Sequence, residues 1–178
     1  TEMAFAAPDW FLDQARIGNM FHACSAGAVT LSTVSTTCTG LALSNTYGSR
    51  KLLIVKQVSF APSTVPAGAS VVGIAIHTAL SSTDTTHTTP MVIHNAIAKG
   101  NVSGGPAGRA DAAATLASTP LWFMPMAAVV ANSSITPAKY NEYVNGSIII
   151  APGGCLSLSY LTTAAVGIAA ITWVEIDE

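Results

Sequence analysis

Hydrophobic residues in the last third of the chain fall into three short runs, at residues 147–151, 155–161 and 166–176. A Pro-Gly-Gly tripeptide at 152–154 separates the first two runs. Because these residues cannot continue a helix or a regular strand ladder, the chain must turn there. The pattern therefore predicts a β-hairpin, followed by a third extended segment.

The run at 155–161 alternates bulky apolar side chains with small ones, which is the period of a β-strand. The bulky face would carry Leu156, Leu158 and Tyr160, and the opposite face Cys155, Ser157 and Ser159. We expect the bulky face to be buried and the small face to be only partly covered. The last run is rich in Val, Ile and Ala around Trp173, which predicts a core strand.

The clearest early strand is predicted at residues 51–62 (KLLIVKQVSFAP). Strict alternation would turn Leu53, Val55, Gln57 and Ser59 to one side, and Leu52, Ile54, Lys56, Val58 and Phe60 to the other. Further strands are expected at 29–37, 39–44, 70–79, 90–95, 112–116 and 121–130. Gly73 predicts a bulge or a close crossing, and Pro125 restricts its strand to a sheet edge or a bulge.

Polar stretches at 80–89, 98–111 and 131–143 are expected to be exposed loops. Between them lie about eight to ten short extended segments, with no alternation of strands and helices. This pattern is typical of an all-β protein, an antiparallel β-sandwich, and the eight-stranded jelly roll is our first choice. We expect one such domain at residues 26–178.

The first 25 residues differ from the rest and are interpreted as an N-terminal arm containing a short helix. Asp9 is placed to cap that helix, and Trp10, Gln14, Ile17 and Phe21 would share one of its sides. Two interpretations stay open: the arm docks on a neighbouring subunit, or it folds back on its own sandwich.

Composition adds one strong constraint, because only 9% of the 178 residues are charged while 50% are hydrophobic. A soluble domain ordinarily has about a quarter charged residues. We therefore expect much of the surface to be covered by further copies or a partner, or else to be coated with Thr, Ser and Asn. The net charge of −2 and the scattered basic residues argue against nucleic-acid binding. The sequence contains no run of roughly twenty apolar residues, so no membrane-spanning segment is predicted.

Candidate chemistry is sparse. The three cysteines, Cys24, Cys38 and Cys155, lack metal-site spacing and are interpreted as reduced and buried. The four histidines, His22, His77, His87 and His94, show no metal-binding pattern. Ser81, Ser82, Asp84 and His87 supply the residue types of a hydrolytic triad, but within a single loop and without a nucleophile turn. We expect no enzymatic activity, no cofactor and no metal.

A resemblance adds to this interpretation. The segments 48–56 (GSRKLLIVK), 146–154 (GSIIIAPGG) and 164–175 (AAVGIAAITWVE), together with the Thr-rich stretch 86–92, resemble the capsid decoration or cement proteins of tailed bacteriophages. The likeness spans residues 45 to 178 and lies in the order of turns and strand segments, not in a specific motif. It implies a jelly-roll-like fold, a trimer on the outer capsid where major capsid subunits meet, and no enzymatic activity. It also implies synthesis in the host cytoplasm and a final location on the virion surface.

On this hypothesis the expected docking residues are Trp10, Phe11, Ile17 and Phe21, with loops 80–89 and 98–111 making inter-subunit or outward contacts. The competing class is a jelly-roll module of a phage spike or fibre that binds a carbohydrate or a receptor. Neither loop contains the aromatic residue that lectin-like sites usually present. An all-β hydrolase is the third class considered.

Overall fold

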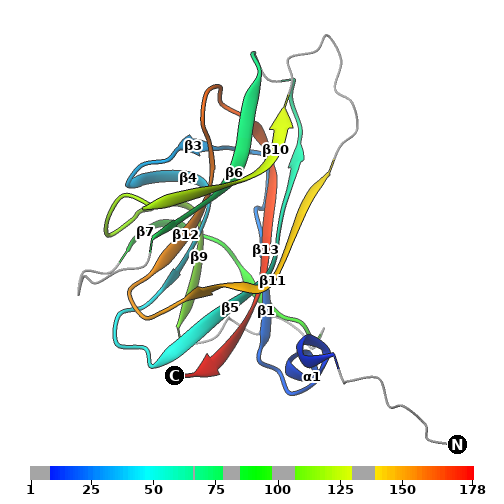
Figure 1. The fold of residues 1–178 in the computed structure, drawn as a ribbon, viewed down its shortest axis with the longest axis vertical. Helices are drawn as coiled ribbons and strands as arrows, with labels where there is room; N and C mark the ends of the chain where they lie inside the picture. Colours follow the sequence, from blue (N-terminus) through cyan, green and yellow to red (C-terminus); the bar gives the residue numbers. More distant parts are fainter. Residues whose placement is uncertain (1–8, 66, 78–84, 98–106, 130–138) are drawn as a thin grey trace, which may run out of the picture.

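The computed structural model describes residues 9–65, 67–77, 85–97, 107–129 and 139–178. They form two β-sheets packed face to face, with a short helix at one end (Figure 1). Sheet A contains β1 (Met20–Cys24), β2 (Val29–Thr30), β5 (Lys51–Pro62), β8 (Ile93–Asn95), β11 (Tyr140–Ile150) and β13 (Val166–Asp177). Sheet B contains β3 (Ser32–Thr33), β4 (Thr37–Asn45), β6 (Ser70–His77), β7 (Thr86–Pro90), β9 (Gly108–Thr115), β10 (Trp122–Val129) and β12 (Cys155–Tyr160). The all-β sandwich expected from the sequence is confirmed.

The strand order is that of a jelly roll. Sheet A runs β11-β5-β13-β1 and sheet B runs β10-β6-β12-β4, so each sheet alternates early strands with late ones. All pairs along these two paths are antiparallel. Two Greek keys wound around one core give this order. The closing strand β13 lies between β5 and β1, which confirms its prediction as a core strand.

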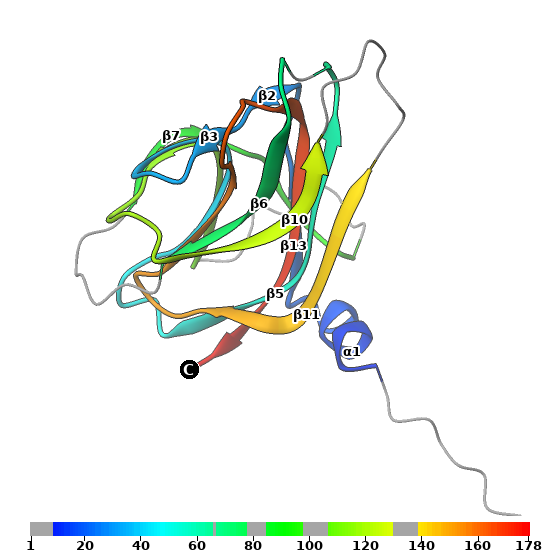
Figure 2. The ribbon, with the colours of Figure 1, turned by 45° about the horizontal axis from the view of Figure 1, so that its top comes forward.

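Three further strands lie between β6 and β10 in the sequence and widen both sheets. β8 pairs with β1 at the edge of sheet A, while β9 and β7 extend sheet B beyond β4. Figure 2 labels β7, the last strand on that side of sheet B. The sequence analysis was wrong here, because Thr86–Pro90 and Gly108–Thr115 are strands that begin inside the predicted loops 80–89 and 98–111. Residues 78–84 and 98–106 lie outside the described residues.

The turn at 152–154 is present, but the predicted hairpin is not. β11 pairs with β5 in sheet A, whereas β12 pairs with β4 and β6 in sheet B. The Pro-Gly-Gly segment therefore carries the chain from one sheet to the other. A turn signal shows where the chain bends, but not which strands then pair.

The strand predicted at 51–62 has the expected bounds, but its two faces change over at Lys56. Gln57 pairs with Thr172 of β13, and Val55 pairs with the next residue, Trp173, so Lys56 forms a β-bulge. The predicted facing was therefore wrong across Lys56. The side chains of β5 that enter the core between the sheets are Leu53, Val55, Val58 and Phe60.

The main core lies between the sheets and contains Trp173, Phe60 and the predicted bulky face of β12. The other face of β12 is also buried, contrary to the expectation of partial cover. Cys155 joins a second apolar cluster with Cys38, Ala42, Ala114 and Leu116. Ser157 and Ser159 lie on the same face and form a hydrogen bond of 3.2 Å between their hydroxyl oxygens.

The expected close crossing at Gly73 and edge position of Pro125 are both confirmed. β10 is an edge strand of sheet B, and its pairing with β6 shifts register between Pro125 and Ala127. A Cβ atom on Gly73 would lie 2.3 Å from the Met124 carbonyl oxygen and 2.4 Å from the Phe123 ring. Only glycine fits at this contact.

Candidate functional site

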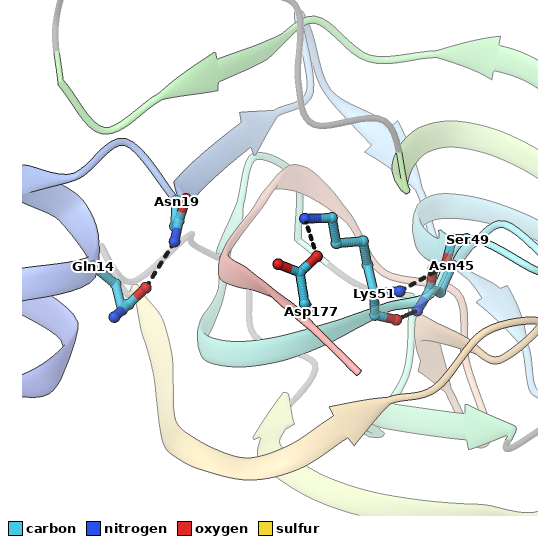
Figure 3. A network of polar contacts seen from close by, with 6 residues as sticks. All are labelled: Gln14, Asn19, Asn45, Ser49, Lys51 and Asp177. Atoms are coloured by element: carbon cyan, nitrogen blue, oxygen red, sulfur yellow. Dashed lines mark hydrogen bonds and ion pairs between the residues drawn. The ribbon is translucent and has the colours of Figure 1, made fainter.

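The N-terminal helix α1 (Trp10–Arg16) carries Trp10 and Phe11, two of the four residues expected to dock, and Ile17 follows directly after its last residue. Asp9 caps it, since an Asp9 carboxylate oxygen accepts a hydrogen bond of 3.1 Å from the Phe11 backbone N–H. The cap expected from the sequence is confirmed. The helix ends at Arg16, and the Asn19 side chain donates to the Gln14 side-chain oxygen at 2.9 Å (Figure 3).

One side of α1 packs against the outer face of sheet A. Phe11 and Ala15 pack, as does Ile176, against a small buried cluster formed by Met20, Ile54 and Val174. The Lys56 ammonium lies 5.3 Å from the centre of the Phe11 ring, within the range of a cation–π interaction. The helix thus folds back on its own sandwich, which was one of the two interpretations left open.

The four expected docking residues take three different positions. Trp10 and Ile17 are exposed, with 41% and 67% of their surface accessible. Phe11 is half-buried on the side of the helix that faces sheet A. Phe21 is only 8% accessible and packs in the main core, with its ring centre 6.0 Å from that of Trp173.

Phe21 therefore cannot share a helix face with Trp10, Gln14 and Ile17, as the sequence pattern suggested. It belongs to β1, which pairs with β13 on one side and β8 on the other. Gly18, with a positive φ of 86°, ends the helical path and lets the chain enter the sheet. The sandwich consequently begins at Met20, within the segment that was expected to be an arm.

Several apolar side chains in and beside α1 are exposed, and we call them together the helix surface. It comprises Trp10, Leu12, Ile17 and Ile97. Ile97 belongs to it because a Cβ atom placed on Gly18 would lie 3.9 Å from the Ile97 Cδ1 atom. Leu12 and Ile97 were not selected by the sequence analysis, because their exposure depends on how α1 lies on the sheet.

A histidine–carboxylate pair forms at the outer edge of sheet B. His87 Nδ1 lies 2.6 Å from an oxygen of Asp111, which is 1% accessible. Burial raises the pKa of Asp111, and the neighbouring His87 and Arg109 oppose that rise without cancelling it. His87 also lines a small pocket of about 170 Å³ with Ser44, Asn45, Thr46, Thr85 and Arg109.

This pair does not complete a hydrolytic triad within the described part of the chain. The partner of His87 is Asp111, whereas Ser81, Ser82 and Asp84 lie outside the described residues. Among the described hydroxyl groups, none forms a hydrogen bond with His87. His77 does bond to Ser118 through its Nε2 atom, but this histidine is buried and its Nδ1 has no partner among the residues described.

The cysteines divide into two kinds. Cys38 and Cys155 are buried free thiols, and burial raises their pKa values to about 11 and about 12 respectively. They are therefore protonated and unreactive at neutral pH. Cys24 is exposed, so its predicted burial was wrong. The described residues contain no group of three His, Cys, Asp or Glu side chains that could hold a metal ion.

The outer face of sheet A carries a groove with a volume of about 320 Å³. Its lining comes from β1, β5 and β13 and from Lys139 just before β11, and comprises His22, Cys24, Gln57, Ser59, Ala61, Lys139, Ile168, Ala170 and Thr172. The sequence analysis did not select this groove. Its one available signal was the expectation that Gln57 and Ser59 share a strand face.

Comparisons with known proteins add no further identification: no protein-family model, curated protein or solved structure matches this chain. No helix among the described residues is long and apolar enough to cross a membrane.

Proposed function

We propose that this protein is a structural component of a bacteriophage virion, a decoration or cement protein of the capsid. It oligomerises, as a trimer, on the outer surface of the head, and it stabilises contacts between major capsid subunits without enzymatic activity. The proposal rests on the resemblance of residues 45–178 to this class of protein, together with the jelly-roll fold. Its partners are further copies of itself and the major capsid protein.

The helix surface is the observation that carries the proposal. A chain with 9% charged residues exposes Trp10, Leu12 and Ile17 within a few residues of one another. Trp10 and Ile17 lie seven positions apart, about two helical turns, and therefore project from the same side of the helix. Exposed apolar side chains that lie together commonly mark contact surfaces between proteins. Tryptophan in particular is enriched among the residues that dominate binding energy.

The mechanism proposed is clamping by several weak contacts made at once. Each copy adds a modest buried area across a joint between capsid subunits. An oligomer engages several such joints together, so that its effective affinity exceeds that of any single contact by a large factor. Phe11 and Lys56 contribute indirectly, because they hold α1 against sheet A.

The test is a double variant, Trp10→Ser with Ile17→Ser, since both side chains are exposed and neither belongs to a buried cluster. We expect the wild-type protein to sediment as an oligomer and to be retained on capsid shells of the encoding phage. The double variant should stay folded, lose the oligomer and lose retention.

Leu121→Ser is the matched control, because Leu121 is equally apolar, 70% accessible and next to β10 on the other sheet. This variant should behave as the wild type does. A wild-type protein that is monomeric in solution and not retained on capsids would contradict the proposal. Unchanged behaviour of the double variant would contradict the role given to the helix surface.

A further inference from the structure

The groove on the outer face of sheet A has the form of a ligand site. Its volume of about 320 Å³ lies within the range of small-molecule sites in proteins, roughly 300–1,000 Å³. Its floor is made by neighbouring strands of one sheet, which hold the side chains of β1, β13 and β5 at fixed spacing. Helix α1 covers the neighbouring part of the same face, over Met20, Ile54 and Val174.

Gln57 lines the groove, and together with the amide of Asn141 beside it presents a donor and an acceptor next to each other. Gln57 Nε2 donates a hydrogen bond of 3.2 Å to the Asn141 side-chain oxygen. This bond leaves the Gln57 oxygen and the Asn141 amide nitrogen with no partner among the described residues. An acceptor next to a donor on a rigid sheet matches two neighbouring hydroxyl groups of a sugar ring, each of which can donate and accept.

The groove is lined by basic side chains and by no acidic one. Lys139 and His22 line it, and His94 lies directly opposite His22 in the pairing of β1 with β8. None of the lining residues is acidic. Partial burial lowers the pKa of His22, and the positive charges of His94 and Lys139 lower it further. A bound anion would relieve the repulsion among these three groups.

An aromatic side chain stands beside the amides. Tyr143 on β11 is the pairing partner of Gln57 and is 57% accessible. Directly paired residues of antiparallel strands place their side chains on the same face of the sheet. The aromatic residue that loops 80–89 and 98–111 lack is therefore available on the sheet itself.

We propose that this groove binds an acidic oligosaccharide. A carboxylate of the ligand lies between Lys139 and His22, hydroxyl groups of the sugar meet Gln57 and Asn141, and a ring stacks on Tyr143. The inference is independent of the capsid-docking role, because it uses the sheet face and not the helix surface. It rests on the charge complementarity of the groove and on its paired amides.

The test uses tetragalacturonate as the probe and its fully methyl-esterified form as the uncharged counterpart with the same hydroxyl groups. We expect calorimetric titration of the intact protein to detect tetragalacturonate, and the ester to bind at least about tenfold more weakly. Affinity for tetragalacturonate should rise as the pH falls from 7.5 to 5.5, because His22 gains a proton while the ligand stays ionised. A His22→Gln variant should lose most of that rise.

Two variants and one control locate the site. Lys139→Gln should weaken tetragalacturonate binding about tenfold and leave ester binding unchanged, whereas Gln57→Leu should weaken both. Lys56→Gln removes a charge of the same kind from β5, but this lysine lies over Phe11 and outside the groove, so binding should not change. Absence of tetragalacturonate binding at millimolar concentration, equal binding of the ester, or equal loss in Lys56→Gln and Lys139→Gln would each overturn the proposal.

Discussion

At the scale of single residues, a few buried polar groups tie distant segments together. Asn45 is 2% accessible, and its amide nitrogen donates to the backbone oxygens of Lys51 at 2.7 Å and Ile150 at 2.9 Å. Its oxygen accepts from the Ser49 hydroxyl at 2.8 Å (Figure 3). In the sequence, Asn45 begins the segment Asn-Thr-Tyr-Gly-Ser at 45–49, whose composition indicates only a turn. Its role in joining three segments depends on residues 105 positions apart, which no local pattern reports.

Glu175 is a second such group. One of its carboxylate oxygens accepts from the Gly108 backbone N–H at 3.0 Å and from the Trp173 indole N–H at 3.1 Å. It is one of three acidic residues within the last four positions of the chain, but it is only 5% accessible. Glu175 accepts the hydrogen bond of the indole N–H of Trp173, which is fully buried. Without this partner, the buried N–H would destabilise the fold.

Asp111 gives a prediction for the pH dependence of stability. The pKa of Asp111 in the folded protein is raised above the usual value of 3.8, chiefly by burial. At pH values between 3.8 and this raised pKa, the folded state therefore binds more protons than the unfolded state. The carboxylate's contribution to the free energy of unfolding therefore falls as the pH rises through that window. Asp111→Asn lacks this group and should not show the fall.

The measurement is urea unfolding of wild type and Asp111→Asn from pH 3.5 to 7. Taking the difference between the two proteins removes the opposite effect of His22, whose pKa is lowered. We expect wild-type stability relative to the variant to decrease with rising pH and then to level off. A difference that grows with pH would show that pairing with His87 outweighs the burial of Asp111.

At the scale of elements, strand positions were easier to predict from sequence than strand faces. Residues 51–62 were assigned correctly because β-branched and aromatic residues concentrate there. Their two faces were assigned wrongly beyond Lys56, because alternation assumes an unbroken ladder and one bulged residue inverts it. The burial of both faces of β12 was also missed. Small polar side chains such as Ser157 and Ser159 suggest an exposed face, but both are buried in the folded protein.

The bulge makes β5 tolerant of one deletion and intolerant of another. Removing Lys56 would leave Val55, Gln57 and Val58 in regular alternation, with Val55 and Val58 still facing the core. The cost should be about 1 kcal/mol in the free energy of unfolding, since the lost cation–π contact with Phe11 is of that order. Thermal or urea unfolding of the deletion variant measures it.

Deleting Ser59 is the matched comparison. Val58 and Phe60 both face the core and flank Ser59, so this deletion turns one of them outward. We expect that protein not to fold, because exposing Phe60 alone forfeits about 3–5 kcal/mol. Similar stability of the two deletion variants would show that Lys56 is an ordinary ladder residue.

At the scale of the whole molecule, the sequence predicted the fold class more accurately than the residue at which the sandwich begins. The jelly roll followed from many short strands without helices, whereas only Trp10 and Ile17 of the four residues selected for docking are exposed. Strands were expected at 90–95 and 112–116, which overlap β8 and β9. The groove and the pairing of β7, β8 and β9 at the sheet edges were not predicted, because both depend on distant segments. The start of the sandwich was placed after residue 25, because β1 is too short to stand out beside a helix-like pattern.

The position of β1 predicts where the chain can be shortened. Removing residues 1–17 deletes α1 and uncovers Met20, Ile54 and Val174, but it leaves both sheets complete. Removing residues 1–25 also deletes β1 from its place between β13 and β8, together with the buried Phe21 and Ala23. Losing the Phe21 side chain alone is worth about 3–5 kcal/mol, against a total stability of about 5–15 kcal/mol for a protein.

We therefore expect the chain 18–178 to unfold cooperatively, at a lower temperature than the full protein, and the chain 26–178 not to fold. Far-ultraviolet circular dichroism with thermal melting distinguishes the two outcomes. Cooperative melting of 26–178 at the same temperature as 18–178 would show that β1 contributes little to the sandwich. Failure of 18–178 to fold would show that α1 is required to cover sheet A. In that case, only point variants of the helix surface could separate an effect on docking from an effect on stability.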